Sequence, residues 1–263
     1  MWFLIFVCVS TVCGVPIKNP PQNNVAAPTD NVIAVQEKIP SESSKGVNVS
    51  MEQNAETLEE FQDQIVQEGD ILMPEDRNAV ETLWLAGIVP YEISSELANR
   101  EWEIQTALKM ISDVTCIRFR KHTNEPNYIV FKNGRGCASY VGCRGGDQPI
   151  FFSPHCAVGN LGHEIIHALG LHHEHTRKDR EDFISVQKQN IVPGRENNFN
   201  VREGKTLNLP YDVNSIMHYG QFFFSKNGLP TLVSKRSGEE MGQRKHLSPL
   251  DIKRLNKLYH CDK

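Results

Sequence analysis

Long apolar runs are almost absent from this chain of 263 residues. One lies at the N-terminus, from Trp2 to Val12, and no later stretch approaches the roughly 20 apolar residues that a membrane-spanning helix requires. Because this run is short and is followed by small residues, it is typical of a signal peptide. We therefore expect residues 1–14 to be a signal, cleaved after Gly14. The product would then reach the extracellular space, for example through secretory granules.

The paired Cys-x-x-Cys spacing of structural zinc sites is also missing from the cysteine cluster. Two of the seven cysteines, Cys8 and Cys13, fall in the expected signal. In an oxidising compartment the others favour disulfides over a zinc knuckle, and their odd number leaves one unpaired. These five cysteines are Cys116, Cys137, Cys143, Cys156 and Cys261.

The chain has no internal repeats, and its basic residues are few in the front part. Residues 1–77 hold 4 of the 28 Lys and Arg but 12 of the 32 Asp and Glu. An acidic front segment and a mildly basic remainder are expected to attract each other, unless each is simply a solvated surface. The hydrophobic content of 39% is sufficient for a folded core.

The front segment changes character along its length. Residues 15–50 are rich in Pro, Asn and Ser without a regular period, which is typical of a flexible segment. Residues 51–67 are acidic and suit a short helix, which Gly69-Asp70 would end. Pro74 to Arg77 resembles an exposed linker, and Arg77 suits a trypsin-like activating protease; an ordinary surface arginine is the alternative.

Regular elements are expected after Pro90. Helices are predicted from Ser94 or Ser95 through Ile111, over 160–169 and over 249–259, and strands over 117–119, 128–131 and 150–152. The glycine-rich stretch 134–146 is predicted to be a loop or irregular edge, and most of the chain beyond Gly170 to be loop. Strands that do not alternate strictly with helices favour an α+β fold.

One motif carries most of the chemistry. His163 and His167 are four residues apart, so on a helix both imidazoles lie on one face and can ligate one zinc ion. Glu164 follows the first histidine, where its carboxylate can accept a proton from a metal-activated water without being a ligand. The pattern therefore predicts a zinc hydrolase, although a bare His-Glu-x-x-His also occurs by chance in helices.

The residues after this motif argue against chance. On a continuous helix, His173 would lie about 15 Å along the axis from His163. Gly170 tolerates positive φ and can end the helix, which would bring His173 back as the third ligand. Three protein ligands plus water are typical of a catalytic zinc site.

With Ser215-Ile216-Met217-His218-Tyr219 further along, in the order expected for a Met-turn, the chain resembles the astacin family of metzincin metalloendopeptidases. The resemblance covers 78–261. It includes 174–180, Pro210-Tyr211-Asp212 and Gly242-Gln243-Arg244. Through 136–143 it extends to fish hatching enzymes and egg-type astacins.

The resemblance implies a two-subdomain catalytic domain over 78–263: a mainly N-terminal twisted sheet with a backing helix and an active-site helix, followed by an irregular C-terminal subdomain. It implies that residues 15–77 are an activation propeptide, with Asp70 occupying the water position on zinc. It also implies that Tyr219 is an additional zinc ligand that stabilises the oxyanion. Met217 would lie beneath the metal, and Asn78, freed by cleavage after Arg77, would bind Glu174.

The same resemblance implies the disulfides Cys137–Cys156 and Cys116–Cys261. Cys143 would then be free or paired between chains. The chain departs from six-cysteine hatching enzymes because it has no cysteine between Asn78 and Cys116.

The expected function is therefore that of a secreted zinc endopeptidase, made as a zymogen, that cleaves extracellular or egg-envelope proteins. We expect a monomer with protein substrates and a trypsin-like activator, and neither a nucleic-acid partner nor a membrane span. The alternatives are a catalytically silent binding protein with the same fold and a zinc hydrolase of non-peptide bonds. Intact Glu164 and Tyr219 argue against the first, and the long histidine motif with the Met-turn argues against the second.

Overall fold

The computed structural model describes residues 55–56, 66–73 and 82–261. All of these residues belong to one compact unit. The expected signal peptide, the expected cut after Arg77 and the expected new N-terminus at Asn78 lie outside the described residues.

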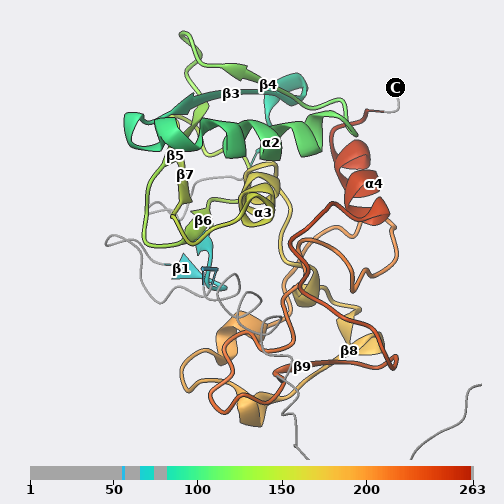
Figure 1. The fold of residues 1–263 in the computed structure, drawn as a ribbon. Coiled ribbons are helices and arrows are strands. Elements are labelled where there is room, and N and C mark those ends of the chain that lie inside the picture. The colour runs from blue at the N-terminus through green and yellow to red at the C-terminus, as the bar shows by residue number, and fades with distance from the viewer. Residues whose placement is uncertain (1–54, 57–65, 74–81, 262–263) are drawn as a thin grey trace, which may run out of the picture. The chain divides into compact units, whose positions relative to one another are not determined.

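A seven-stranded mixed sheet supports the site (Figure 1), with the strand order β1-β2-β6-β7-β5-β3-β4. Its strands are β1 (Val66–Gln67), β2 (Ile71–Leu72), β3 (Ile88–Ile93), β4 (Arg118–Lys121), β5 (Tyr128–Lys132), β6 (Cys137–Ser139) and β7 (Asp147–Phe152). The pairs β3–β4, β3–β5, β5–β7 and β2–β6 are parallel, whereas β1–β2 and β6–β7 are antiparallel. The two strands that precede Arg77 therefore extend the sheet beside β6.

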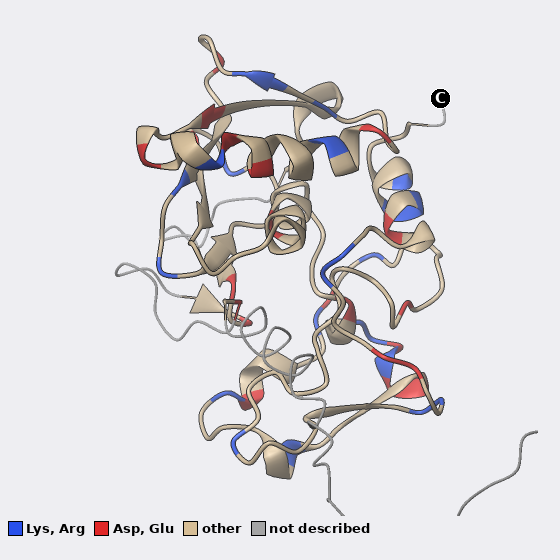
Figure 2. Ribbon diagram, viewed as in Figure 1, with Lys and Arg blue, Asp and Glu red and all other residues tan. Residues whose placement is uncertain are grey.

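Two α-helices, α2 (Glu101–Ser112) and α3 (Val158–Ala168), pack with this sheet around one apolar core. Apolar side chains at spacings of three and four residues place Ile104, Leu108 and Ile111 of α2 in that core. Figure 2 shows acidic residues at the start of α2 and a basic residue toward its end, an order that complements the helix dipole.

The chain after α3 is mostly irregular and has a second, smaller core that includes Phe199, Tyr219 and Phe223. Strands β8 (Ile184–Val186) and β9 (Leu232–Ser234) form an antiparallel pair there, and helix α4 (Pro249–Leu258) follows. The short 3-10 helices are η1 (Leu85–Gly87), η2 (Ser95–Arg100), η3 (Glu174–Thr176), η4 (Arg180–Asp182), η5 (Lys188–Asn190) and η6 (Glu196–Phe199). The expected α+β fold with a regular N-terminal and an irregular C-terminal subdomain is confirmed.

Both disulfides implied by the resemblance are present, Cys116–Cys261 and Cys137–Cys156. The first joins Cys116, which lies just before Ile117 and β4, to Cys261, which follows α4. These two cysteines are 145 residues apart in the sequence. Cys143 is free and buried.

Several elements differ from the sequence prediction. β3 was not predicted, because Pro90 lies inside it and proline usually argues against a strand between two neighbours. β6 lies within the stretch predicted to be irregular. The predicted helix over 51–67 is wrong at its described end, where residues 66–67 form β1.

Among the described residues, no helix combines the length and the apolar character needed to cross a membrane.

Substituting Gly170 tests the turn that ends α3. Gly170 has a φ of 106°, and an added Cβ would lie 3.1 Å from Leu83 Cδ2. We expect Gly170→Ala to lower the free energy of unfolding by about 1–2 kcal/mol, because this backbone conformation is unfavourable for a residue with a Cβ. Urea unfolding measures the change. Gly204→Ala is the matched control, because a Cβ there meets nothing within 4 Å. Equal stabilities for the two variants would contradict this reading.

Candidate metal centre

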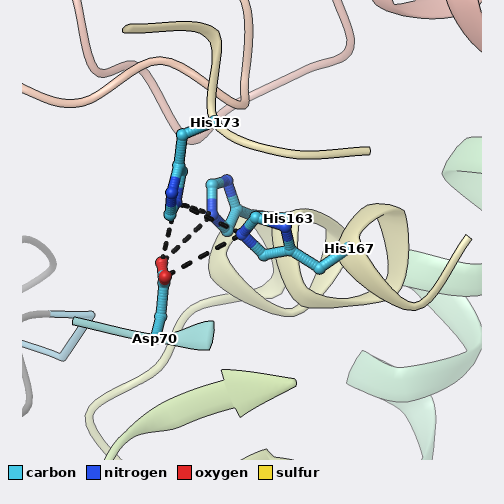
Figure 3. Close-up of side chains that lie close together, drawn as sticks. All are labelled: Asp70, His163, His167 and His173. Carbon is cyan, nitrogen blue, oxygen red and sulfur yellow. Dashed lines mark hydrogen bonds and ion pairs between the residues drawn. The ribbon is translucent and has the colours of Figure 1, made fainter. Parts of the chain in front are cut away.

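Helix α3 and the turn after it bring three histidines together (Figure 3). His163 and His167 project from one face of α3, which ends at Ala168. The chain then reverses at Gly170, whose N–H donates to the carbonyl of His167 at 2.8 Å. His173 returns to face the helix, as the spacing of the motif predicts. All three histidines are buried.

The donor atoms of the cluster lie at the separations expected around one ion. His173 Nε2 is 3.3 Å from His163 Nε2 and 3.2 Å from His167 Nε2. Asp70 Oδ2 lies 3.2 Å from Nε2 of both His163 and His173. Tetrahedral zinc with bonds of about 2.0–2.1 Å would separate its ligand atoms by about 3.3–3.4 Å. The four residues therefore fit a zinc ion.

The other ring nitrogens assign the tautomers. Nδ1 of His163 lies 2.8 Å from the carbonyl oxygen of Ile216, and Nδ1 of His167 lies 2.7 Å from that of Leu171. Carbonyl oxygens only accept, so Nδ1 carries the proton and each Nε2 presents a lone pair. Lone pairs that converge on one point beside a carboxylate repel one another unless a cation lies between them.

Unpaired buried oxygens support the same conclusion. Asp70 Oδ1 and both carboxylate oxygens of Glu164 are buried, and none has a hydrogen-bond partner. Buried carboxylate oxygens without donors are unfavourable in a folded protein. A metal ion among the histidines would satisfy Asp70 Oδ1, and a water that replaced Asp70 on that metal would satisfy Glu164.

The ionisation of the cluster follows from burial and mutual charge. Burial lowers the pKa of His167 well below its usual range, and His163 and His173 lower it further. Burial alone would raise the pKa of Asp70, but His173 and His163 outweigh it and hold that pKa below its usual range. Burial raises the pKa of Glu164 well above its usual range, and Asp70 adds to the rise. A neighbouring cation lowers the pKa of a carboxyl group, so Glu164 can serve as a base beside a bound metal.

The stretch from Ser215 to Tyr219 supports the cluster from behind. Asp251 in the first turn of α4 accepts from Ser215 Oγ at 2.5 Å and from the Ile216 N–H at 2.9 Å. The Ile216 carbonyl in turn fixes His163, as described above. Met217 is 1% exposed, and its carbonyl accepts from the Glu174 N–H at 2.9 Å. This turn therefore links α4 to two parts of the histidine motif.

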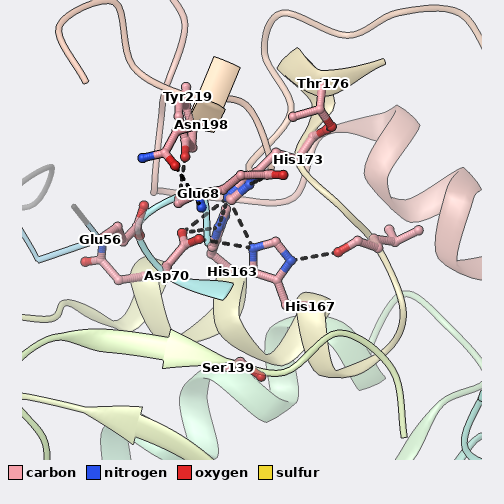
Figure 4. Close-up of polar contacts among 12 residues, drawn as sticks. Glu56, Glu68, Asp70, Ser139, His163, His167, His173, Thr176, Asn198 and Tyr219 are labelled. Atoms are coloured by element: carbon pink, nitrogen blue, oxygen red, sulfur yellow. Dashed lines mark hydrogen bonds and ion pairs between the residues drawn. The ribbon is translucent and has the colours of Figure 1, made fainter. Parts of the chain in front are cut away.

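Tyr219 lies beside the cluster, with its ring centroid 4.7 Å from that of His173. Its hydroxyl donates to the backbone carbonyl of Glu68, in the segment before Arg77 (Figure 4). The phenol is thus engaged by that segment in this structure. Burial raises the pKa of Tyr219 well above its usual range, and Asp70 raises it further.

Glu174, the residue after the third histidine, is buried and already paired. Its Oε1 accepts from Arg254 Nη2 at 2.5 Å, from Arg177 Nη1 at 3.2 Å and from the Asp212 N–H at 2.8 Å. Burial raises the pKa of Glu174 to about 7, while Arg254 and Arg177 oppose the rise. A cavity of about 480 Å³ adjoins this carboxylate and is also lined by Met217.

Another contact from the front segment was not anticipated from the sequence. Glu56 is fully buried, and its carboxylate accepts from Arg244 Nη2 at 2.6 Å and from Asn160 Nδ2 at 2.5 Å. Asn160 also accepts from the Ala157 N–H at 2.8 Å, at the start of α3. No local sequence pattern pairs an acidic residue with an arginine 188 residues away.

Comparisons with known proteins agree with this geometry. The sequence profile of the peptidase family described as Astacin matches residues 76–260. High choriolytic enzyme 1 of Oryzias latipes is 37% identical over 214 residues, which cover 76% of this chain and 79% of that protein. Zinc metalloproteinase nas-14 of Caenorhabditis elegans is 40% identical over 188 residues, or 68% of this chain.

Some relatives are much longer than the matched region. The match spans 37% of nas-14 and 32% of Blastula protease 10 of Paracentrotus lividus, about a third of each. Among solved structures, that of high choriolytic enzyme 1, described as a hatching enzyme zinc-protease, superposes with a TM-score of 0.65 at 35% identity. It covers 73% of this chain and 100% of that one. This chain therefore belongs to the astacin family of zinc metalloendopeptidases, and its histidine cluster is positioned to bind a metal ion.

Proposed function

We propose that the chain is a secreted zinc endopeptidase made as a zymogen, with residues 1–14 as signal, 15–77 as propeptide and 78–263 as catalytic domain. One observation carries the proposal. Asp70, which precedes Arg77, supplies the fourth donor to the three-histidine site. A segment that fills the open position of a catalytic metal keeps substrate and water out of it.

Peptide hydrolysis would use few groups. His163, His167 and His173 would hold a zinc ion, which would act as a Lewis acid toward the peptide carbonyl and make a water more acidic. Glu164, whose two oxygens have no protein partner, accepts the proton from the attacking water and passes it to the leaving amine. Tyr219 stabilises the charge that develops on the carbonyl oxygen once its hydroxyl is released from the propeptide.

Latency also involves the sheet. β2 of the propeptide pairs with the free edge of β6, where the Ser139 N–H donates to the Asp70 carbonyl at 2.9 Å. An extended substrate can bind such an edge by adding a strand. The propeptide therefore occupies the substrate's edge as well as the metal. Glu56 fixes it further by its ion pair with Arg244.

Activation would follow cleavage after Arg77 by a trypsin-like protease. The new ammonium group of Asn78 would enter the cavity beside Glu174 and pair with that carboxylate. The raised pKa of Glu174 supports this step, because a buried carboxylate gains from a further cationic partner. The substrates we propose are extracellular proteins, including those of egg envelopes, cleaved by a monomeric enzyme. The similarity to high choriolytic enzyme 1 supports that substrate class.

Removing the metal should destabilise the precursor. Four buried donor residues meet at one point, so losing the cation leaves repelling lone pairs and a buried carboxylate. We expect about 4 kcal/mol less stability, when the reference contains free zinc at about 1,000 times its dissociation constant. Thermal unfolding with and without a chelator measures the loss. A His167→Ala precursor should respond much less to the chelator, whereas an unchanged melting temperature of the wild type would count against the site.

Replacing the proposed base tests the catalytic role most simply. We expect Glu164→Gln to retain one zinc per chain and to lose about 100- to 10,000-fold in peptide hydrolysis after trypsin activation. Metal analysis and a casein-type assay provide the two readouts. Glu92→Gln, at an exposed position on β3, should keep full activity. Substantial hydrolysis by Glu164→Gln would refute the assignment.

Replacing Asp70 tests the zymogen. We expect uncleaved Asp70→Ala precursor to hydrolyse peptides without trypsin, because the fourth position on zinc becomes accessible. Full activity after trypsin treatment would show that the variant has folded. Asp113→Ala, which removes an exposed ion pair with Lys109, should remain latent. A fully silent Asp70→Ala precursor that trypsin still activates would argue against the switch.

A further inference from the structure

Glu68, two residues before Asp70, contacts the part of the chain after Arg77 through all its polar groups, and Figure 4 shows it beside His173, Asn198 and Tyr219. It is 1% exposed. Its Oε2 lies 2.7 Å from His173 Nδ1, and its Oε1 accepts from Arg202 Nε at 2.8 Å. Its N–H donates to Asn198 Oδ1 at 3.2 Å, and its carbonyl accepts from the Tyr219 hydroxyl.

The partners of the three zinc histidines are not equivalent. His163 and His167 each donate from Nδ1 to a backbone carbonyl within 82–261, which cleavage after Arg77 leaves in place. His173 instead donates from Nδ1 to a carboxylate that precedes Arg77. Activation would therefore remove the partner of this ligand and of no other.

The backbone of Glu68 indicates that its position is imposed by these contacts. Its φ of 52° is unfavourable for a residue with a side chain, and Gly69 follows with a φ of 82°. Such a conformation costs about 1–3 kcal/mol and persists where the surroundings fix it. Arg202 holds the second oxygen of the carboxylate while His173 holds the first, so Glu68 has little freedom to turn away.

We propose that Glu68 is a positioning residue for the metal: the propeptide supplies the outer carboxylate that orients and strengthens His173 as a zinc ligand. A carboxylate on the far nitrogen of an imidazole fixes the ring and raises its basicity, and losing such a partner typically costs about 10- to 100-fold in metal affinity. The zymogen therefore holds zinc more tightly than the activated enzyme. Cleavage exposes the metal and also makes His173 a weaker donor, which leaves the zinc a stronger Lewis acid.

This inference rests on the proposed zymogen, and it is distinct from the blocking role of Asp70. Asp70 fills the fourth position on zinc, whereas Glu68 acts through a ligand that remains after activation. Glu68 also holds the Tyr219 hydroxyl through its own backbone carbonyl, which no side-chain substitution removes. Substituting Glu68 therefore tests the carboxylate alone.

The experiment measures zinc release from purified, uncleaved precursor in the presence of excess chromogenic chelator. We expect Glu68→Gln and Glu68→Ala to release zinc about 10- to 100-fold faster than the wild type. The matched control is Glu56→Gln, which removes another buried propeptide carboxylate, paired with Arg244 and not with a zinc ligand. If Glu68→Gln and Glu68→Ala release zinc no faster than Glu56→Gln, the proposal is overturned.

Cobalt substitution provides a readout that general loosening of the propeptide would not change. We expect the visible absorption bands of the cobalt(II) precursor to shift in Glu68→Gln and to stay unchanged in Glu56→Gln, because only the first alters a ligand's partner. Identical spectra for all three precursors would overturn the proposal.

Trypsin treatment adds an internal control. After cleavage at Arg77 and removal of the propeptide, every variant yields the same catalytic chain, so the differences in zinc release must disappear. Differences that persist in correctly cleaved protein would overturn the proposal, since they would reflect misfolding. Failure of the proposed function would look different: the wild-type precursor would bind no zinc, or trypsin would cut elsewhere and yield no activity.

Discussion

The lone pairs of three imidazole nitrogens point at one common position in a buried space. They repel one another unless a cation lies between them. The Nε2 atoms of His163 and His167 each lie 3.2–3.3 Å from that of His173, and every ring is buried. Much of the molecule serves this arrangement. The helix period aligns two of the rings, and Gly170 reverses the chain to bring in the third. A turn held by Asp251 fixes the ring of His163.

The segment before Arg77, which we propose to be a propeptide, takes part in the same site. It adds strands to the sheet beside β6 and places Asp70 beside the three histidines. Glu68 and Glu56 form ion pairs with buried groups of the catalytic part. These contacts cover the histidine cluster, one of its three rings in particular, and the edge of the sheet. We propose that latency results from several contacts that a single cut would release together. The acidic side chains of Glu56 and Glu68 pair with particular residues of the later part of the chain.

Local patterns explain what the sequence could predict. The four-residue spacing of His163 and His167 and the turn at Gly170 depend only on helix geometry and on the backbone freedom of glycine. The apolar period likewise located α2, although residues 95–100 of the predicted helix form the 3-10 helix η2, and the start of α3 was predicted to within two residues. The disulfide pairs followed from the family resemblance and not from cysteine spacing. The position of Asp70 among the donors was likewise expected from the resemblance.

Contacts between distant residues explain what the sequence could not predict. Glu68 is 105 residues from His173, and Asp251 is 35 residues from Ile216, so no periodic pattern connects either pair. β3 was missed because proline is unusual between two neighbouring strands, and tertiary pairing outweighed that preference. The acidic composition of the front segment gave no sign that Glu56 and Glu68 are buried.

The most direct test of the account is a crystal structure of the zinc-loaded, uncleaved precursor with anomalous data collected at the zinc edge. We predict one strong anomalous peak, bounded by Nε2 of His163, His167 and His173 and by the carboxylate of Asp70. A peak at another position, or an Asp70 carboxylate turned away from the metal, would contradict it.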